Sequence, residues 1–283
     1  MAVLFGRRII VDVAGLTITE PRIHVDLERQ IDKTQDRGEI AIYNLSDEHE
    51  KQIYERGAAL TVQAGYPETT AIIYQGQLAR VERVRERNAR ITKIKIGDEV
   101  RQRNRLGGYY AESLAGTTPV RQIVERIVKA MNAARPAVFA TPLFPIRLGP
   151  LDAIPAGATF EDWQWDSGGA ELALTTILDY VDCTWFEYDG VIRINRTRVL
   201  QSDAPMVAIS PETGLIDRPA VTDEGAECKM FLNPAVRLGG LLDITSEALI
   251  GQFKIVSIRH TADNWQGPFR TFCDLRPLDD AGV

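Results

Sequence analysis

The sequence predicts an α+β protein that is mainly β, with two β-barrel or β-sandwich domains separated by a helical and mixed insert. Three observations predict it. Short alternating strands fill the first hundred residues, apolar stripes of helical period follow, and strands return over the last eighty residues. The predicted domains are residues 1–105, the insert 106–200, and residues 201–283. A chain of 283 residues can bury such cores without disulfides or metals.

The strands of the first domain follow from the period-two alternation of apolar residues, which is clearest in Arg7–Ala14. A short helix is expected from Ser46 to Arg56, because the Ser46 side chain can cap free amides and Gly57 can stop the helix. Further strands are expected at Leu16–Glu20, Arg22–Leu27, Glu39–Tyr43, Ala59–Gly65, Thr70–Gly76, Gln77–Arg87 and Ala89–Gly97. Many short strands are typical of a small barrel or sandwich.

Two amphipathic helices are expected in the insert. The first runs to Ala134, and Pro119 suits its first helical position. Its apolar stripe has helical spacing and consists of Val120, Ile123, Val124, Ile127, Val128 and Met131. The second helix covers about Gly168–Tyr180, with an apolar face of Leu172, Leu174, Ile177 and Leu178.

Turn residues divide the rest of the chain. Five prolines within residues 135–158 predict an extended connector. Asp189 and Gly190, placed between two alternating runs, predict a hairpin with strands at Thr184–Tyr188 and Val191–Asn195. In the last domain, strands are expected at Cys228–Leu232, Leu241–Thr245, Phe253–Thr261 and Phe269–Leu275.

The net charge of −6 is unevenly distributed, with +9 over residues 51–150 and −11 over residues 151–250. The acidic excess argues against a dedicated nucleic-acid binder. The three cysteines and three histidines show no zinc-binding spacing, so no metal or cofactor is expected. The sequence also lacks an apolar run of transmembrane length, and no membrane association is expected.

One histidine offers a candidate general base. His260 is followed by Asp263, which could orient its ring. No Gly-x-Ser-x-Gly or His-Glu-x-x-His motif accompanies the pair. The alternative is a structural histidine at a strand end, hydrogen-bonded to the following turn. This alternative is favoured, so no catalytic residue is predicted.

Carboxylates also cluster at Glu161, Asp162 and Asp166, and paired acids of this kind could cleave a glycan. Trp163 and Trp165 alternate with them and could form a platform for a sugar. The other interpretation is an amphipathic strand or turn whose indoles cover the edge of the core. Glycan cleavage and carbohydrate binding are therefore the alternative functions.

Ten Arg and Lys side chains lie within residues 80–105. Like charges on one face of a strand repel unless they meet solvent or a partner. A groove for single-stranded nucleic acid would also need interleaved aromatic residues, which this run lacks. The predicted subunit interface consists of Arg83, Arg85 and Arg87, which share a face by the period of two, with Lys93 and Lys95 on the next strand. A solvated strand face is the alternative.

Two sets of short motifs lie on either side of the insert. The first set is IAIYNLS at residues 40–46, VQAGY at 62–66 and IYQGQL at 73–78. The second set is SPETGLI at residues 210–216, FLNP at 231–234 and GQFKI at 251–255, followed by His260 and Asp263. In order and spacing these motifs resemble the baseplate hub proteins of contractile-tailed bacteriophages, whose β domains are similar to the tail tube.

This resemblance implies a structural virion protein of the tail baseplate, without enzymatic activity or cofactor. Family hubs are trimers in which each subunit carries two tube-like domains, so the ring matches a hexameric tail tube above and a trimeric spike below. The implied partners are further copies of the chain, the tail tube protein, the spike protein and other baseplate proteins. The lumen could contact DNA or the tape measure protein. Assembly is expected in the host cytoplasm.

Overall fold

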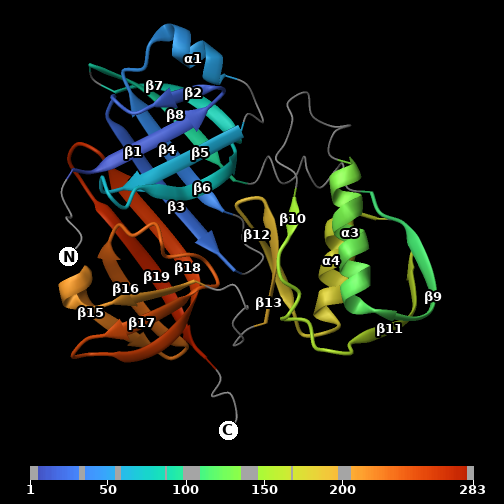
Figure 1. Ribbon diagram of the computed structural model, residues 1–283. Coiled ribbons are helices and arrows are strands. Elements are labelled where there is room, and N and C mark those ends of the chain that lie inside the picture. Colours follow the sequence, from blue (N-terminus) through green and yellow to red (C-terminus); the bar gives the residue numbers. More distant parts are fainter. Residues whose placement is uncertain are drawn as a thin grey trace.

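The computed structural model describes residues 6–31, 36–54, 59–86, 88–97, 109–134, 146–166, 168–196 and 205–278. Over these residues the protein is mainly β with three α-helices, so the predicted α+β, mainly β class is confirmed (Figure 1). None of the sheets closes into a barrel within the described ranges, so of the two alternatives the open, sandwich-like arrangement is observed.

Two facing sheets enclose the first core. One has the strand order β2-β1-β5-β6, with bounds Leu16–Ile18, Arg8–Val13, Ala59–Gly65 and Ala71–Gln77. The facing strands are β3 (Ile23–Gln30), β4 (Arg37–Tyr43), β7 (Arg80–Glu86) and β8 (Ala89–Ile96). Buried aliphatic residues from both sheets pack together between them. Helix α1 (Asp47–Ile53) lies at one end, and the Ser46 hydroxyl caps it by accepting a hydrogen bond from the His49 amide at 3.2 Å.

The insert has its own core. Its elements are β9 (Glu112–Pro119), α3 (Val120–Ala134), β10 (Arg147–Leu148), β11 (Thr159–Trp165), α4 (Ala170–Asp179), β12 (Thr184–Tyr188) and β13 (Val191–Asn195). The two helices pack against each other, and β9 pairs with β11. Figure 1 shows the hairpin β12–β13 between the helices and the main sheets. Phe186 and Tyr188 of this hairpin join the core of the C-terminal strands.

The last part of the chain forms β14 (Met206–Ile209), a 3-10 turn (Pro211–Thr213), β15 (Leu215–Thr222), β16 (Gly225–Phe231), β17 (Leu241–Thr245), β18 (Ile250–Asp263) and β19 (Phe269–Pro277). The long strand β18 pairs with β17 near its start and with β3 over Ser257–Asp263. This second pairing joins the first and last parts of the chain into one sheet of order β15-β16-β19-β18-β3-β4-β8-β7.

Some elements differ from the sequence predictions. Pro119 ends strand β9 instead of beginning α3, because residues 117–119 pair with β11. Leu172 is exposed, and the buried face of α4 consists of Ala170, Ala173, Leu174, Ile177 and Leu178. Strands β9, β10, β14 and β15 were not predicted. Strand β10 lies within the predicted connector, where it pairs in parallel with β13. The predicted domain boundaries at residues 105 and 200, with Gly57 and residues 135–145 of the connector, lie outside the described residues.

Candidate assembly interface

Within the described residues, the ten-stranded sheet has three edge strands. The uncharged strand β14 pairs with β17 alone, and the other two, β7 and β15, lie at the ends of the main strand order. Within the described residues, β7 pairs with β8 alone and β15 pairs with β16 alone. The outer backbone groups of both strands are therefore open to another strand, the usual starting point of β-augmentation. The two edges carry opposite charge. Residues 80–96 contain seven Arg or Lys and two Glu, whereas residues 215–231 contain four Asp or Glu and two Arg or Lys.

On the basic edge, Arg83 and Arg85 are exposed and share one face of β7, as the alternation predicts. Arg83 forms an ion pair of 2.5 Å with Glu50, a buried carboxylate on α1 that also accepts a hydrogen bond from Thr92. Arg85 lies opposite Arg90 across the β7–β8 pair. Arg87 lies outside the described residues. Among the predicted interface cations, Arg85 is therefore the exposed one for which the described chain shows no ion pair.

Lys93 and Lys95 lie on the opposite face of the sheet from Arg83, because they alternate along β8 with Thr92, which lies opposite Arg83. Both lysines pair with Glu39 of the neighbouring strand β4. Burial would raise the pKa of Glu39, but these two ammonium groups outweigh it and lower that pKa. The expected basic interface is thus divided between two faces of the sheet.

The β15 edge is acidic and exposed. Asp217 pairs with Lys229 of β16 at 2.9 Å, and Arg218 lies 3.5 Å from Glu247. Glu224, in the turn to β16, pairs with Arg276. Val221 is also exposed on this strand. Asp217 and Arg218 balance each other in formal charge within β15, so the acidic excess of this edge comes from Asp223 and Glu224 in the turn and from Glu227 on β16.

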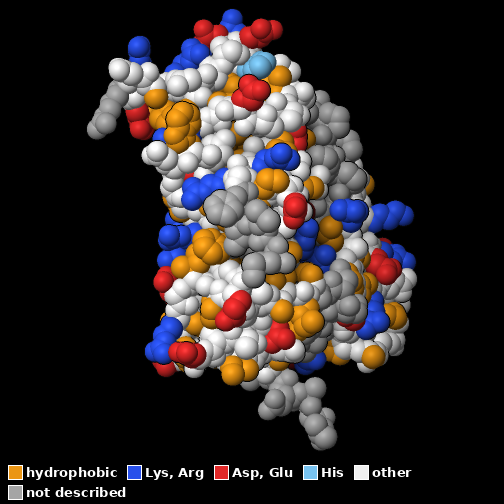
Figure 2. Space-filling view, turned by 60° about the vertical axis from the view of Figure 1, so that its left-hand side comes forward, with side chains coloured by type: hydrophobic (Ala, Val, Ile, Leu, Met, Phe, Trp, Pro, Cys, Tyr) orange, Lys and Arg blue, Asp and Glu red, His pale blue; other side chains and the backbone are white. Residues whose placement is uncertain are grey.

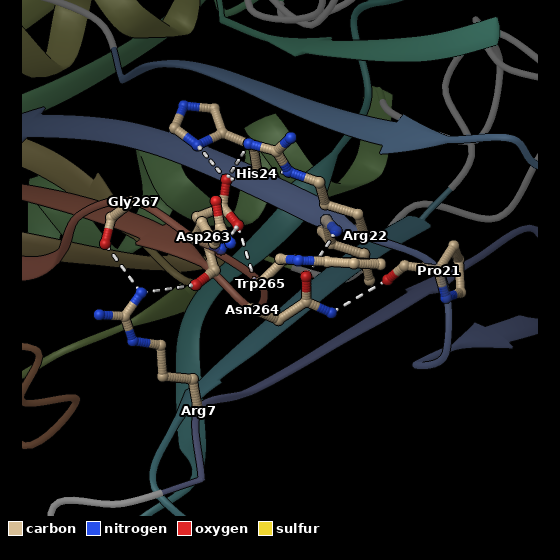
Figure 3. A network of polar contacts seen from close by, with 10 residues as sticks. Arg7, Pro21, Arg22, His24, Asp263, Asn264, Trp265 and Gly267 are labelled. Atoms are coloured by element: carbon tan, nitrogen blue, oxygen red, sulfur yellow. Dashed lines mark hydrogen bonds and ion pairs between the residues drawn. The ribbon is translucent and has the colours of Figure 1, made fainter. Parts of the chain in front are cut away.

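Ion pairs also lie across the junction of β3 and β18. Arg259 donates to both carboxylate oxygens of Asp26, at 2.9 and 2.8 Å. At the end of the junction, Arg22 donates to the buried carboxylate of Asp263 at 2.8 Å (Figure 3). Burial would raise the pKa of Asp263, but the Arg22 guanidinium and the amides of the following turn lower it below its usual value. The motif aspartate is therefore a fixed, ionised anchor of this junction.

The structure separates the His260–Asp263 pair. The two side chains lie on opposite faces of β18, because they are three residues apart on a strand. His260 is only 2% exposed, and its Nδ1 lies 3.0 Å from the Thr271 hydroxyl on β19. Burial, and then the nearby Arg29, lower its pKa to about 3. The histidine near Asp263 is instead His24, at 3.7 Å. His260 is thus a buried core residue, bonded to the neighbouring strand and not to the following turn.

Arg29, which was not among the predicted site residues, links the first part of the chain to the insert. Its buried guanidinium on β3 donates to Asp36 at 3.1 Å and to Asp189, in the hairpin turn of the insert, at 2.8 Å. It also lies over the Tyr188 ring at 3.8 Å. Burial would lower the pKa of Arg29, but the two carboxylates raise it well above its usual value. Arg237 of the last domain lies 3.6 Å from the same Asp189.

The candidate glycan residues do not form a shared cleft. Glu161 accepts a hydrogen bond from the Thr117 hydroxyl at 2.7 Å, and Asp162 accepts one from the Gly116 amide at 2.6 Å. Asp166 accepts one from the nearby Gln164. All three carboxylates are exposed, and none lines the cavity at β7 or the groove beside β2 and β4. Each of the three carboxylates therefore already accepts a hydrogen bond within the insert.

The prediction that Trp163 and Trp165 form a platform for a sugar is also wrong. Trp163 is buried in the core of the insert, and Trp165 stacks on it with ring centroids 5.8 Å apart. Both indoles belong to the side that packs on the helices. The interpretation of an amphipathic strand with core-covering indoles fits β11.

Two further properties bear on the kind of site. Nowhere in the described ranges do three or more His, Cys, Asp or Glu side chains gather as ligands for a metal ion. Over the same ranges, no helix has the length and apolar character needed to cross a membrane. On the face shown in Figure 2, apolar side chains are scattered among charged ones of both signs. The arrangement is that of a mainly antiparallel β scaffold whose main strand order ends in a basic and an acidic edge.

Solved structures of tail proteins share this fold. The 43 kDa tail protein of prophage MuSo2 from Shewanella oneidensis matches with a TM-score of 0.63 over 96% of this chain and 98% of its own, at 10% identity. A tail protein from Neisseria meningitidis matches with a TM-score of 0.62 over 96% and 97%, at 11% identity. The resemblance to phage tail proteins is therefore confirmed at the level of the fold.

A third match extends beyond phages. The E. coli c3393 protein is a type VI secretion system component with structural similarity to the T4 bacteriophage tail proteins gp27 and gp5. It matches with a TM-score of 0.60 over 95% of this chain and 77% of its own, at 11% identity. No family model matches the chain, and no curated protein matches it in sequence.

Proposed function

We propose that the chain is a structural hub of a phage tail baseplate, assembled in the host cytoplasm as a ring of three copies. The ring joins the tail tube to the central spike and to the surrounding baseplate. One observation carries the proposal. The two β parts of a single chain already pair edge to edge through β3 and β18, and the resulting strand order has a basic strand, β7, at one end and the acidic β15–β16 region at the other.

A head-to-tail ring follows from these two edges. If β7 of one copy adds to β15 of the next, each contact repeats the edge-to-edge strand pairing already present within the chain, and both ends of the main strand order are paired in the closed ring. Charged side chains on an edge either prevent pairing or select a partner of opposite charge. The net charges of +9 over residues 51–150 and −11 over residues 151–250 favour the second case, in which the edge of one copy selects the oppositely charged edge of another.

The face of the sheet that carries Lys93 and Lys95 would line the lumen. Its cations are largely neutralised, because both lysines pair with Glu39 and Arg259 pairs with Asp26. A balanced surface releases few counterions and therefore binds nucleic acid weakly. This supports a channel through which DNA or the tape measure protein can pass.

Charge reversal at the basic edge tests the proposal. Arg85→Glu is expected to weaken the ring, because it places a carboxylate against the acidic β15 edge without breaking an ion pair that the described chain shows. The matched control is Lys129→Glu, an exposed reversal on α3 of the insert. Light scattering should give three chains for the wild type and the control, and smaller species for Arg85→Glu. A wild-type protein that stays monomeric and binds neither tube nor spike contradicts the hub proposal.

A further inference from the structure

Trp265 is presented to solvent by the turn between β18 and β19. Its side chain is 71% exposed, whereas Trp163, Trp165 and Trp185 are buried or half-buried. A single exposed apolar residue is ordinary by itself. This one differs because the turn that carries it is fixed and a groove lies beside it.

The turn is held by hydrogen bonds on both sides (Figure 3). The Asp263 carboxylate accepts hydrogen bonds from the amides of Trp265 at 2.8 Å and Gln266 at 3.0 Å. Asn264 accepts one from the Ile23 amide and donates one to the Pro21 carbonyl. The entropy of ordering this turn is therefore lost on folding and not on binding, which favours an anchor for a partner.

A groove of about 680 Å³ lies against this turn. Its wall combines two aromatic side chains, Trp265 and Tyr43, with exposed polar groups of Thr17, Thr19, Asn44, Ser46 and His49. Arg22 also lines it, but its charge is neutralised by Asp263. Glu20 also lines the groove, and the described chain shows no ion pair for its carboxylate. The Arg22 guanidinium already lies over the Tyr43 ring, 4.7 Å from its centroid. The groove therefore offers a partner the Trp265 indole and the Glu20 carboxylate.

The groove lies at one end of the strands, and the Asn44 side chain in its wall accepts a hydrogen bond from the amide of Arg90, which lies opposite Arg85 of β7. The groove lies at the Ile23 end of β3, whereas the Arg29 contact with the insert lies near the other end, roughly 20 Å away at the rise of a strand. Strands β7 and β15 lie at the lateral ends of the sheet. A protein reaching the groove would thus approach along the strands, from the side opposite the insert.

We propose that this groove docks a loop of another tail protein, stacked on the end of the ring opposite the insert. A Lys or Arg of that loop lies on the Trp265 indole and pairs with Glu20. An indole face attracts cations, and tryptophan is enriched among the residues that dominate interface energy. The inference depends on the proposed hub function, because it needs a protein stacked along the axis.

Two measurements on purified tails test the docking. Hydroxyl-radical oxidation of Trp265 is expected to be at least tenfold slower in assembled tails than in the isolated protein. Ile250, 77% exposed at the opposite end of β18, is the internal reference in the same samples. Carbodiimide treatment of the tails should join Glu20 to a lysine of a different tail protein.

Substitutions in the groove provide a second test of the docking. Trp265→Ala and Glu20→Gln should each lower incorporation into tails about tenfold and leave the mass of the isolated ring unchanged, whereas Ile250→Ala should do neither. Equal oxidation of Trp265 in the tail and in the isolated protein overturns the inference. So does protection already present in the isolated ring, or a cross-link from Glu20 to a second copy. The mass of the isolated protein tests the hub proposal separately.

Discussion

Arg29 lies where the alternation of Ile23, Val25 and Leu27 along β3 would place another apolar side chain. A buried cation at such a position needs carboxylate partners, and these come from Asp36 and from Asp189. The sequence signal was present in the pattern, but the predicted strand ended at Leu27. The partner Asp189 is 160 residues away, so spacing alone could not identify it.

Removing this cation should be costly. Arg29→Met leaves Asp36, whose side chain is 16% exposed, without a cation that the described chain shows, and leaves Asp189, 13% exposed, with the more distant Arg237 alone. The free energy of unfolding should fall by about 3–5 kcal/mol. The matched control is Arg259→Met in the half-exposed pair with Asp26, which should lower it by about 1 kcal/mol or less. Urea unfolding measures both values. Similar losses of unfolding free energy in the two variants would show that Arg29 does not hold the first part of the chain to the insert.

His260 should make stability depend on pH. Its pKa is about 3 in the folded protein, against about 6.5 in an unfolded chain, so below pH 6.5 the unfolded chain binds a proton that the folded chain does not. Stability should therefore fall as the pH drops from 6.5 towards 3, by up to about 1.4 kcal/mol per pH unit from this group. His260→Asn should unfold with a shallower pH dependence in urea titrations. Equal slopes would contradict the burial of a neutral imidazole.

Among the elements, α1 depends on its cap. Ser46→Ala removes the acceptor of the His49 amide and should lower the free energy of unfolding by about 1 kcal/mol. Ser46→Asp keeps an acceptor at the helix start and should be close to neutral. Thermal unfolding of the two variants distinguishes them. Equal destabilisation by both would mean that the hydroxyl does not cap the helix.

Local chemistry decided which elements could be predicted. The hairpin of β12 and β13 was predicted with its observed bounds, because Asp189 and Gly190 adopt the positive φ that such a turn requires. Strands β9 and β15 were missed because they are mostly exposed and carry few alternating apolar residues. Their pairing partners, β11 and β16, stabilise them, and this stabilisation is not visible in local propensity.

At the scale of the whole molecule, the sequence predicted two β parts around an insert but not their union in one sheet. The β3–β18 pairing joins residues 227 to 239 positions apart, and neither strand carries a local sequence signal for its partner. This dependence on pairing between strands also explains why the residues of the predicted basic interface lie on two faces of the sheet. The strand positions of Lys93 and Lys95 were predicted, but their face depends on the register with β7.

In the proposed ring, β7 of one copy pairs with β15 of the next. Amide hydrogen exchange of the isolated assembly, measured for each strand, tests this pairing. If the ring closes in this way, the amides of β7 and β15 should exchange as slowly as those of the central strands β3 and β18. Fast exchange along β7 and β15, with β3 and β18 protected, would contradict it.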